Sequence, residues 1–254
     1  MRRVVFVDLD DTLFQTQRKN PHAGRLAAVD RDGNPLSFSC CRQEAFLDWL
    51  ANDALVIPVT GRSVDAFRRV TLPLGDRAIC SFGGVILDAA GNPEPEWHGR
   101  IADAADATAG MLDLLLGAVV DAAAIHRIDV RHRIIRDAGL PLYISVKHNA
   151  GLAEEMTRLA NAVSPSIPPG WTLHVNANNM ALLPPFLSKA AAVAFFLERF
   201  GGEAPFLTVG VGDSLTDVGF MGMCDFAITP SKSQIMSVLL WQPPLAAAEA
   251  GVQI

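Results

Sequence analysis

Val4-Val5-Phe6-Val7-Asp8-Leu9-Asp10-Asp11-Thr12 is the stretch that decides how this chain folds. Its first four residues are apolar and β-branched or aromatic, which is typical of a central parallel strand buried on both faces. Two carboxylates, those of Asp8 and Asp10, follow this run. Open α/β sheets bind ligands at the carboxyl ends of their strands, so we expect both acids to lie in a site. Two acids one residue apart can divide the chemistry, one attacking and the other moving a proton.

Working outward from this stretch, predicted strands and helices alternate as in a parallel sheet with helices on its faces. The strands are predicted at 3–8, 55–60, 77–81, 206–211 and 225–228, and the helices at 42–52, 64–72 and 188–200. A turn-rich segment, 30–34, predicts a β-hairpin within 24–40. The predicted fold class is therefore α/β, with a doubly wound, Rossmann-like parallel-sheet core.

The segment 85–184 breaks this alternation. It is predicted to form helices at 103–124 and 152–163 and strands at 127–135, 142–148, 171–176 and 180–183. Short turns between strands, together with two helices, indicate an α+β insertion. We therefore expect a core domain made of 1–84 and 185–254, and an inserted domain made of 85–184.

Three further polar motifs occur downstream of Asp8–Thr12. Thr60-Gly61-Arg62 ends the second predicted strand, Lys189 opens a helix behind the predicted N-cap Ser188, and Gly212-Asp213-Ser214-Leu215-Thr216-Asp217 follows the strand 206–211. In this order the four segments resemble the motifs of the haloacid dehalogenase-like phosphohydrolases, with Asp8–Thr12 matching DxDxT and 212–217 matching GDxxxD. The αββαββ order of 85–184 resembles the larger class of cap in that superfamily, as in its Cof-like, sucrose-phosphate and mannosyl-3-phosphoglycerate phosphatase branch.

The resemblance implies a Mg²⁺-dependent phosphatase acting on a small phosphorylated metabolite, with a sugar phosphate as the leading expectation. Asp8 would be the nucleophile that forms an aspartyl-phosphate, and Asp10 would be first the acid for the leaving oxygen and then the base for water. The phosphoryl group would be bound by Thr60, Gly61 and Lys189. The metal ligands would be Asp8, Asp213 and the Asp10 carbonyl, with Asp217 behind them orienting water or Lys189.

Three segments depart from the relatives' pattern. The relatives often carry a glycine-containing Pro-x-Gly-x-x-Lys-Gly stretch where this chain has Pro185-Phe186-Leu187-Ser188-Lys189-Ala190. They also often have Asn at the place of Thr216, and Asn-Gly-Ala where this chain has Phe82-Gly83-Gly84. None of these departures removes a catalytic group.

Apolar and polar residues alternate along the predicted strands of the insertion, which gives one apolar face and one polar, net-positive face. The two helices of the insertion should cover the apolar face, and the polar face should look outward or roof the active site. The expected substrate-binding residues are Arg62, Arg131, Arg133, Lys147 and His174. For any one cap residue alone, a solvated side chain is the simpler interpretation.

Bulk composition excludes several functions. The chain has 254 residues, is half hydrophobic and carries a formal charge of −6 without a Lys/Arg-rich block, which argues against nucleic-acid or anionic-membrane partners. We also expect no signal peptide and no apolar run of about 18 residues that could span a membrane. Four cysteines without CxxC spacing indicate reduced thiols. We therefore expect a cytoplasmic monomer or homodimer.

Two other functions stay open. A phosphomutase would use the same acids and share this cap, but it would return the phosphoryl group to a sugar. A sugar-phosphate-binding regulator could keep the fold without turnover, although the complete set Asp8, Asp10, Lys189 and Asp213 argues against it. A dehalogenase is disfavoured because Asp10 would have no leaving oxygen to protonate.

Overall fold

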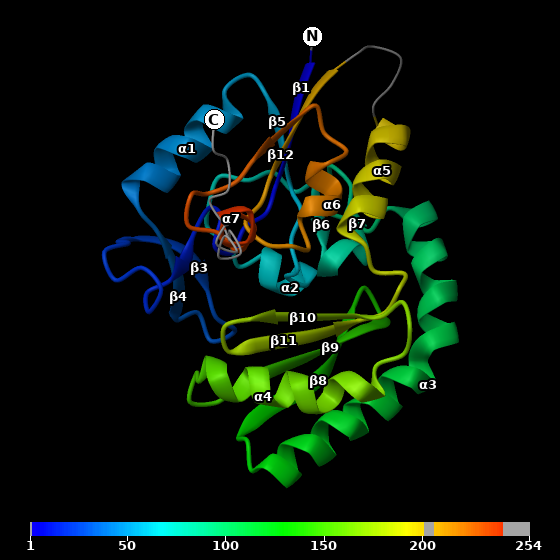
Figure 1. The fold of residues 1–254 in the computed structure, drawn as a ribbon. Coiled ribbons are helices and arrows are strands. Elements are labelled where there is room, and N and C mark those ends of the chain that lie inside the picture. Colours follow the sequence, from blue (N-terminus) through cyan, green and yellow to red (C-terminus); the bar gives the residue numbers. More distant parts are fainter. Residues whose placement is uncertain (1, 201–205, 241–254) are drawn as a thin grey trace, which may run out of the picture.

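The computed structural model describes residues 2–200 and 206–240, and the chain forms a parallel-sheet core with an antiparallel, helix-backed cap beneath it (Figure 1). The core sheet has the order β13-β12-β1-β5, with all neighbours parallel. Its strands are β1 (Arg2–Val7), β5 (Leu55–Pro58), β12 (Phe206–Val211) and β13 (Phe226–Ile228). The predicted α/β class with a doubly wound sheet is confirmed.

β1 is the central strand because it pairs with β12 on one side and β5 on the other. Its run Val4–Val7 is buried, as its composition predicts, and the Phe6 ring meets the Phe196 ring edge to face at 5.7 Å. The core helices are α1 (Cys41–Ala51), α2 (Val64–Phe67), α5 (Lys189–Phe200), α6 (Val218–Met221) and α7 (Gln234–Leu240). Beside them lie the short strands β2 (Gln15–Thr16), β3 (Arg25–Val29), β4 (Pro35–Ser39), β6 (Ala78–Cys80) and β7 (Val85–Leu87).

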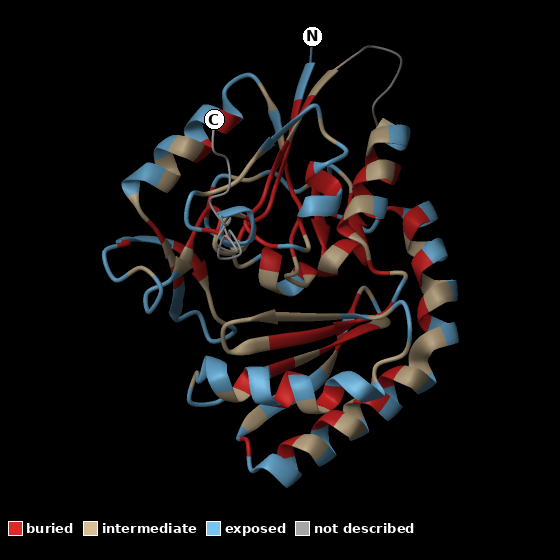
Figure 2. Ribbon diagram, in the orientation of Figure 1, coloured by how far each residue is buried: buried red, intermediate tan, exposed pale blue. Residues whose placement is uncertain are grey.

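The cap is a four-stranded antiparallel sheet of order β10-β11-β9-β8 with two helices on one face. Its strands are β8 (Val130–Asp137), β9 (Leu140–His148), β10 (Thr172–Asn176) and β11 (Asn179–Leu183), and its helices are α3 (Pro95–His126) and α4 (Ala153–Val163). One buried cluster joins both helices to the apolar face of the sheet, and includes Leu112, Leu115, Met156, Leu159, Ile144 and Val146. The expectation that the helices cover this face is confirmed, and Figure 2 shows the buried stripe on each helix.

Two helices differ from the predicted boundaries. α3 begins at Pro95 instead of 103, because Pro is favoured in the first turn and the Glu94 side chain caps the helix by accepting from the Trp97 N–H at 2.6 Å. Trp97 belongs to the core cluster, so α3 runs from the core into the cap. α2 ends at Phe67 instead of 72, because the chain beyond it turns to bridge Val70 to Ala28 of the hairpin.

α3 also corrects an expectation about membranes. It contains an 18-residue window of mean hydropathy 1.7 with at most two charged residues, so by length and composition it could cross a bilayer. The expectation that the chain has no such run was therefore wrong. A single helix of this kind is weak evidence for a span, and one stripe of α3 packs against the cap sheet.

Candidate active site

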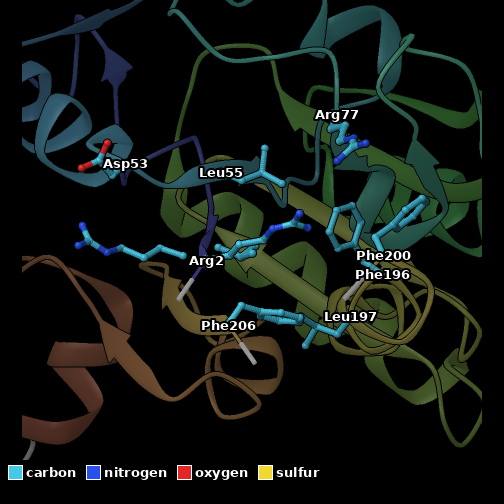
Figure 3. Close-up of a pocket in the computed structure, with 10 residues that line it drawn as sticks. Arg2, Asp53, Leu55, Arg77, Phe196, Leu197, Phe200 and Phe206 are labelled. Atoms are coloured by element: carbon cyan, nitrogen blue, oxygen red, sulfur yellow. The ribbon is translucent and has the colours of Figure 1, made fainter. Parts of the chain in front are cut away.

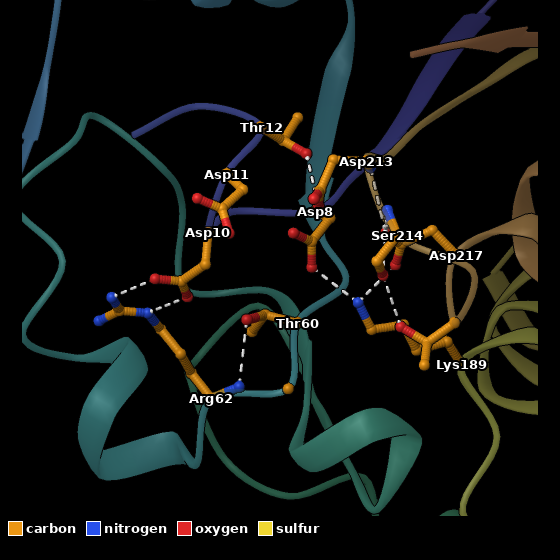
Figure 4. Close-up of polar contacts among 12 residues, drawn as sticks. Asp8, Asp10, Asp11, Thr12, Thr60, Arg62, Lys189, Asp213, Ser214 and Asp217 are labelled. Carbon is orange, nitrogen blue, oxygen red and sulfur yellow. Dashed lines mark hydrogen bonds and ion pairs between the residues drawn. The ribbon is translucent and has the colours of Figure 1, made fainter. Parts of the chain in front are cut away.

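The motifs at three strand ends meet at one edge of the core sheet (Figure 4). Asp8 follows β1, Thr60 follows β5, and Asp213 follows β12, and all three side chains are buried. The chain continues the sheet pairing up to this edge, since the Asp8 N–H donates to the Val211 carbonyl at 2.8 Å. Neighbouring parallel strands thus place these side chains together, as the sequence predicts.

Lys189 reaches this cluster from the first residue of α5. Its ammonium lies 2.6 Å from Asp8 Oδ1 and 2.6 Å from Asp217 Oδ1, and all three groups are buried. Burial alone lowers the pKa of Lys189, but the two carboxylates outweigh it and hold the pKa above its usual value. A cation at a helix N-terminus is unfavourable by itself, so the carboxylates stabilise its position there. Ser188 caps the helix as predicted, accepting from the Ala191 N–H at 3.1 Å.

Both carboxylate oxygens of Asp217 accept hydrogen bonds from protein groups. Its Oδ1 pairs with Lys189, while its Oδ2 accepts from the Asp213 N–H at 3.2 Å and from the Ser214 N–H at 2.9 Å. Gly212 makes room for it, because a Cβ there would lie 2.5 Å from Asp217 Cβ. Asp217 therefore orders the loop and Lys189, which agrees with a place behind the reacting groups.

Asp8, Asp213 and Asp217 each present a carboxylate oxygen within 4.8 Å of the others. Burial raises the pKa of Asp213 to about 7, and the charges of Asp217 and Asp11 add to this effect. Burial likewise raises the pKa of Asp8 more than Lys189 lowers it. Among the residues that the structure describes, Asp213 has no cation within ion-pair distance, and a buried carboxylate without one is costly. An all-oxygen donor set of this kind is the type that Mg²⁺ prefers, and Asp8 and Asp213 could supply its carboxylates.

Asp10 is held by Arg62 through two parallel contacts. Arg62 Nε lies 2.6 Å from Asp10 Oδ2, and Arg62 Nη2 lies 2.8 Å from Asp10 Oδ1 (Figure 4). Burial alone would raise the pKa of Asp10, but the Arg62 guanidinium outweighs it and holds the pKa below its usual value. Arg62 also packs over the Phe14 ring at 4.9 Å. Arg62 was expected to contact the substrate, whereas in the structure its guanidinium binds the Asp10 carboxylate.

Thr60 and Gly61 offer donors beside Asp8. Thr60 Oγ1 accepts from the Arg62 N–H at 3.1 Å, which leaves its own O–H to donate elsewhere. Residue 61 must be glycine because a Cβ there would lie 2.5 Å from the Phe82 ring. Phe82 sits in the tight turn Ser81–Gly83 with a left-handed φ of 57°. Sequence reasoning noticed this segment only as a departure and missed that its ring forms a wall of the site.

The polar face of the cap sheet turns toward the core. Tyr143, Ser145 and Lys147 share one face of β9, and Tyr143 Oη donates to the Gly61 carbonyl at 2.9 Å. On the neighbouring strand, Arg131 stands opposite Lys147 and Arg133 opposite Ser145. At the other edge of the sheet, the His174 ring lies 5.9 Å from the Phe82 ring. Of the two orientations left open by the sequence, the roofing one is observed.

The cap contacts the core at two edges. On one, the buried Asp137 Oδ2 accepts from the Val64 N–H at 2.9 Å and from Ser81 Oγ at 2.6 Å. On the other, Arg18 donates to the Gly151 carbonyl at 2.9 Å and to Asn178 Oδ1 at 3.2 Å. These cap contacts were not predicted, because nothing in the local sequence pairs residues more than 50 positions apart.

Comparison with known proteins bears on the fold alone. No protein-family model and no curated protein matches the sequence. Among solved structures, IMP-bound IMP-nucleotidase from Plasmodium falciparum matches with a TM-score of 0.59 at 10% identity, covering 94% of this chain and 66% of that one. The C-terminal domain of C. albicans trehalose-6-phosphate phosphatase matches with a TM-score of 0.54 at 14% identity, and the match covers 87% of this chain and 72% of that one. Synechocystis sp. PCC6803 sucrose-phosphatase, with sucrose and phosphate bound, matches with a TM-score of 0.52 at 16% identity, and the match covers 96% of this chain and 90% of that one.

The chain has the haloacid dehalogenase-like fold. Within this fold, the residues expected from the four motifs form a single cluster, with Asp8 at its centre and Lys189 and Asp213 on either side (Figure 4). Phe82-Gly83-Gly84, one of the three departures from the relatives' sequence pattern, lies beside this cluster: the Phe82 ring centroid is 5.9 Å from Lys189 Nζ.

A cavity of about 240 Å³ lies at the opposite end of the haloacid dehalogenase-like core (Figure 3). It is lined by the amino ends of β1, β5 and β12, at Arg2, Leu55 and Phe206, and by aromatic residues of α5. Among the described residues that line it, Asp53 is the only carboxylate. The carboxylates that could hold a metal or move a proton are those at the carboxyl ends of the strands.

Proposed function

We propose that this protein is a Mg²⁺-dependent phosphatase that hydrolyses a small phosphorylated metabolite through an aspartyl-phosphate. The observation that carries this proposal is the placement of Asp8. One of its oxygens is neutralised by the buried Lys189, while Asp213 lies beside it without a cation partner among the described residues. Such a carboxylate can approach a phosphoryl group whose negative charge the surrounding cations offset.

In the first step, an Asp8 oxygen attacks phosphorus while the bond between phosphorus and the leaving oxygen breaks on the opposite side. Asp10 gives its proton to that leaving oxygen, which departs as an alcohol. Arg62 stabilises the ionised form of Asp10, so the Arg62–Asp10 pair must loosen before Asp10 can carry this proton. The Thr60 hydroxyl and the Gly61 N–H would hold a phosphoryl oxygen.

In the second step, Asp10 accepts a proton from water, and the oxygen of that water attacks phosphorus. The bond between phosphorus and Asp8 breaks, so inorganic phosphate leaves and the Asp8 carboxylate is regenerated. The ionised Asp10 that Arg62 favours is the form this step requires. Lys189 stays beside Asp8 throughout and stabilises the charge on the phosphoryl oxygens.

Asp8, Asp213 and the Asp10 backbone carbonyl would hold Mg²⁺, which when bound supplies positive charge against the phosphoryl oxygens. The leading expectation for the substrate is a sugar phosphate. Two observations support it: the polar face of the cap that roofs the site, and the fold shared with a sucrose-phosphatase and a trehalose-6-phosphate phosphatase.

The test is phosphate release from a panel of phosphorylated metabolites and p-nitrophenyl phosphate, with Mg²⁺ and after EDTA treatment. We expect release that EDTA abolishes and Mg²⁺ restores. Asp8→Asn should lower kcat by several orders of magnitude, because no other group can form the covalent intermediate. Asp103→Asn, which changes an exposed acid of α3, is the matched control and should leave kcat unchanged.

Four outcomes would contradict the proposal. Formation of isomeric sugar phosphates without net phosphate release would indicate a phosphomutase. Binding of sugar phosphates with no turnover of any phosphoester would indicate a regulator that kept the fold. Full activity in metal-free protein, or an Asp8→Asn variant retaining more than about a tenth of the activity, would rule out the proposed mechanism.

A further inference from the structure

A cavity of about 390 Å³ lies between strands β8 and β9 of the cap and the β3–β4 hairpin of the core. Its volume lies within the range of small-molecule sites in proteins. Its lining includes five cationic side chains, those of Arg31, Arg69, Arg131, Arg133 and Lys147. Among the described residues, Asp30 and Asp32 are the only acids in the lining. We call this cavity the basic groove.

The acids near the basic groove do not neutralise its cap side. Asp30 is used by its own turn, because its Oδ1 accepts from the Asp32 N–H at 2.9 Å and from the Asn34 N–H at 2.8 Å. Arg69 pairs with Asp65, a residue of α2, and Arg31 lies 3.8 Å from the same carboxylate. The hairpin side of the groove is therefore largely compensated.

Among the described residues, no close ion pair neutralises the cations on the cap side. Among the residues that the structure describes, neither Arg133 nor Lys147 has an acidic side chain within ion-pair distance, and Arg131 contacts only the amide oxygen of Asn149, at 3.1 Å. Arg131 also stands directly opposite Lys147 across β8 and β9. Like charges in that position destabilise a sheet. Burial, followed by the charge of Arg131, lowers the pKa of Lys147. An anion bound there would remove this cost.

The basic groove lies on the side of the site where a leaving group must be. Asp10 protonates the leaving oxygen in the proposed mechanism, and Lys147 lies on the polar face of the cap sheet that turns toward the core. Lys147 shares its face of β9 with Tyr143, which contacts Gly61 next to Arg62. A second cavity, of about 430 Å³, opens instead beside Lys189 and Phe82, on the phosphoryl side. A leaving group that departs next to Asp10 is therefore directed toward the basic groove.

We propose that the substrate is a phosphomonoester whose leaving group carries a second anionic group, a carboxylate or a second phosphate, which Arg133 and Lys147 bind in the basic groove. This inference rests on the proposed phosphatase function and adds the class of substrate to it. The bonds that form and break are those already described, and the second anion takes no part in them. Its role is to hold the leaving oxygen next to Asp10.

The test compares pairs of esters that differ only in that second anion. The carboxylate pair is 3-phosphoglycerate against glycerol 3-phosphate, and the phosphate pair is fructose 1,6-bisphosphate against fructose 6-phosphate. With Mg²⁺ present, we expect kcat/KM to be at least about tenfold higher for the anionic member of one pair, the size of one charge-assisted contact. The pair that shows this advantage identifies the anion, and the advantage should shrink as ionic strength rises.

Variants locate the effect in the basic groove. Arg133→Gln and Lys147→Met should each reduce the ratio of kcat/KM between the anionic and neutral members by about tenfold. This ratio within one variant cancels any general loss of activity. Arg158→Gln is the matched control, since it removes one positive charge from α4 on the other side of the cap and should leave the ratio unchanged.

Each outcome decides the inference. Equal kcat/KM within both pairs, in a protein that hydrolyses p-nitrophenyl phosphate, would overturn the inference and leave the phosphatase function standing. An anionic advantage that survives in both groove variants would overturn the assignment to Arg133 and Lys147. No phosphate release from any ester would overturn the proposed function and this inference with it.

Discussion

Lys189 is the residue on which the electrostatics of the site depend, because it is the cation between two buried carboxylates. Removing one member of a buried ionic network leaves the others without a partner, so Lys189→Met should lower the free energy of unfolding by about 3–5 kcal/mol at pH 7.5. The loss should be smaller at pH 5, where Asp8, whose pKa burial raises, can take up a proton. Urea unfolding in EDTA measures both values.

Lys232→Met provides the control for this prediction, because Lys232 is an exposed lysine. Its substitution should change the unfolding free energy by less than about 0.5 kcal/mol. If Lys189→Met were no more destabilising than Lys232→Met, Lys189 would not be the buried counterion of Asp8 and Asp217.

Asp213 predicts how stability depends on pH in metal-free protein. Its pKa rises from the ordinary 3.8 to about 7 on folding, so the folded state holds its proton more tightly than the unfolded state does. The contribution of Asp213 to the free energy of unfolding is therefore fully present below about pH 4. It is lost as pH rises to about 7, by roughly 4 kcal/mol. Asp8, whose pKa is also raised, acts with the same sign.

Asp213→Asn should therefore flatten the fall in unfolding free energy between pH 4 and 7, measured by urea titrations in EDTA. Mg²⁺ should stabilise the wild type most above pH 7, where Asp213 is ionised, and should stabilise the variant less. Asp113→Asn, at an exposed position of α3, should keep the wild-type slope. An unchanged slope in Asp213→Asn would show that this carboxyl is not the one that titrates.

Single residues also show where sequence reasoning succeeds and where it stops. Asp8 and Asp213 could be predicted because an acid that follows an apolar strand marks a sheet edge, and the fold brings such edges together. The places of Phe82 and Tyr143 in the site could not be predicted in this way. An aromatic side chain has the same local sequence pattern whether it forms the wall of a site or fills a core. Only the packing of the cap on the core separates the two cases.

At the scale of elements, the turn Ser81–Gly83 fixes the start of α5 and with it Lys189. Gly83 has a φ of +95°, and a Cβ there would lie 2.3 Å from the Ser188 carbonyl oxygen. Gly83→Ala should therefore displace the first turn of α5, lower the unfolding free energy by about 1–3 kcal/mol and reduce kcat. Thermal unfolding and phosphate release measure the two effects.

Gly99→Ala is the matched control for Gly83→Ala. Gly99 lies within α3 with no atom within 4 Å of an added Cβ, so alanine should stabilise the protein by up to about 1 kcal/mol and leave kcat unchanged. Equal kcat for Gly83→Ala and the wild type would mean that α5 holds Lys189 without support from this turn.

Element boundaries were predictable where local signals dominate. Ser188 and Lys189 begin α5 as predicted, because an N-cap is a local feature. The predicted end of α2 was wrong because a tertiary contact, and not a local signal, ends this helix. Its helical pattern continues past Phe67, but Thr71 Oγ1 donates to the Leu26 carbonyl at 2.8 Å and draws the chain onto the hairpin. Such tertiary contacts override propensity, and the sequence around α2 does not contain them.

At the scale of the whole molecule, we expect the proposed activity to depend on a cap that stays over the core. Arg18 joins the core to the cap by donating to the Gly151 carbonyl and to Asn178 Oδ1 at the edge away from Asp137. Gly151 permits this approach, since a Cβ there would lie 2.4 Å from Arg18 Nη1. A protein whose closed form is less populated binds its substrate more weakly in proportion.

Arg18→Ala should therefore raise KM by about fivefold, since an exposed charged contact contributes about 1 kcal/mol. The free energy of unfolding should change by less than about 0.5 kcal/mol, because Arg18 lies at the surface. Arg25→Ala is the matched control: this arginine pairs with Glu44 at 3.2 Å within the core, so its loss should leave KM unchanged. Steady-state kinetics on one substrate compares the three proteins. Equal KM values for Arg18→Ala and Arg25→Ala would show that Asp137 and Tyr143 hold the cap closed without Arg18.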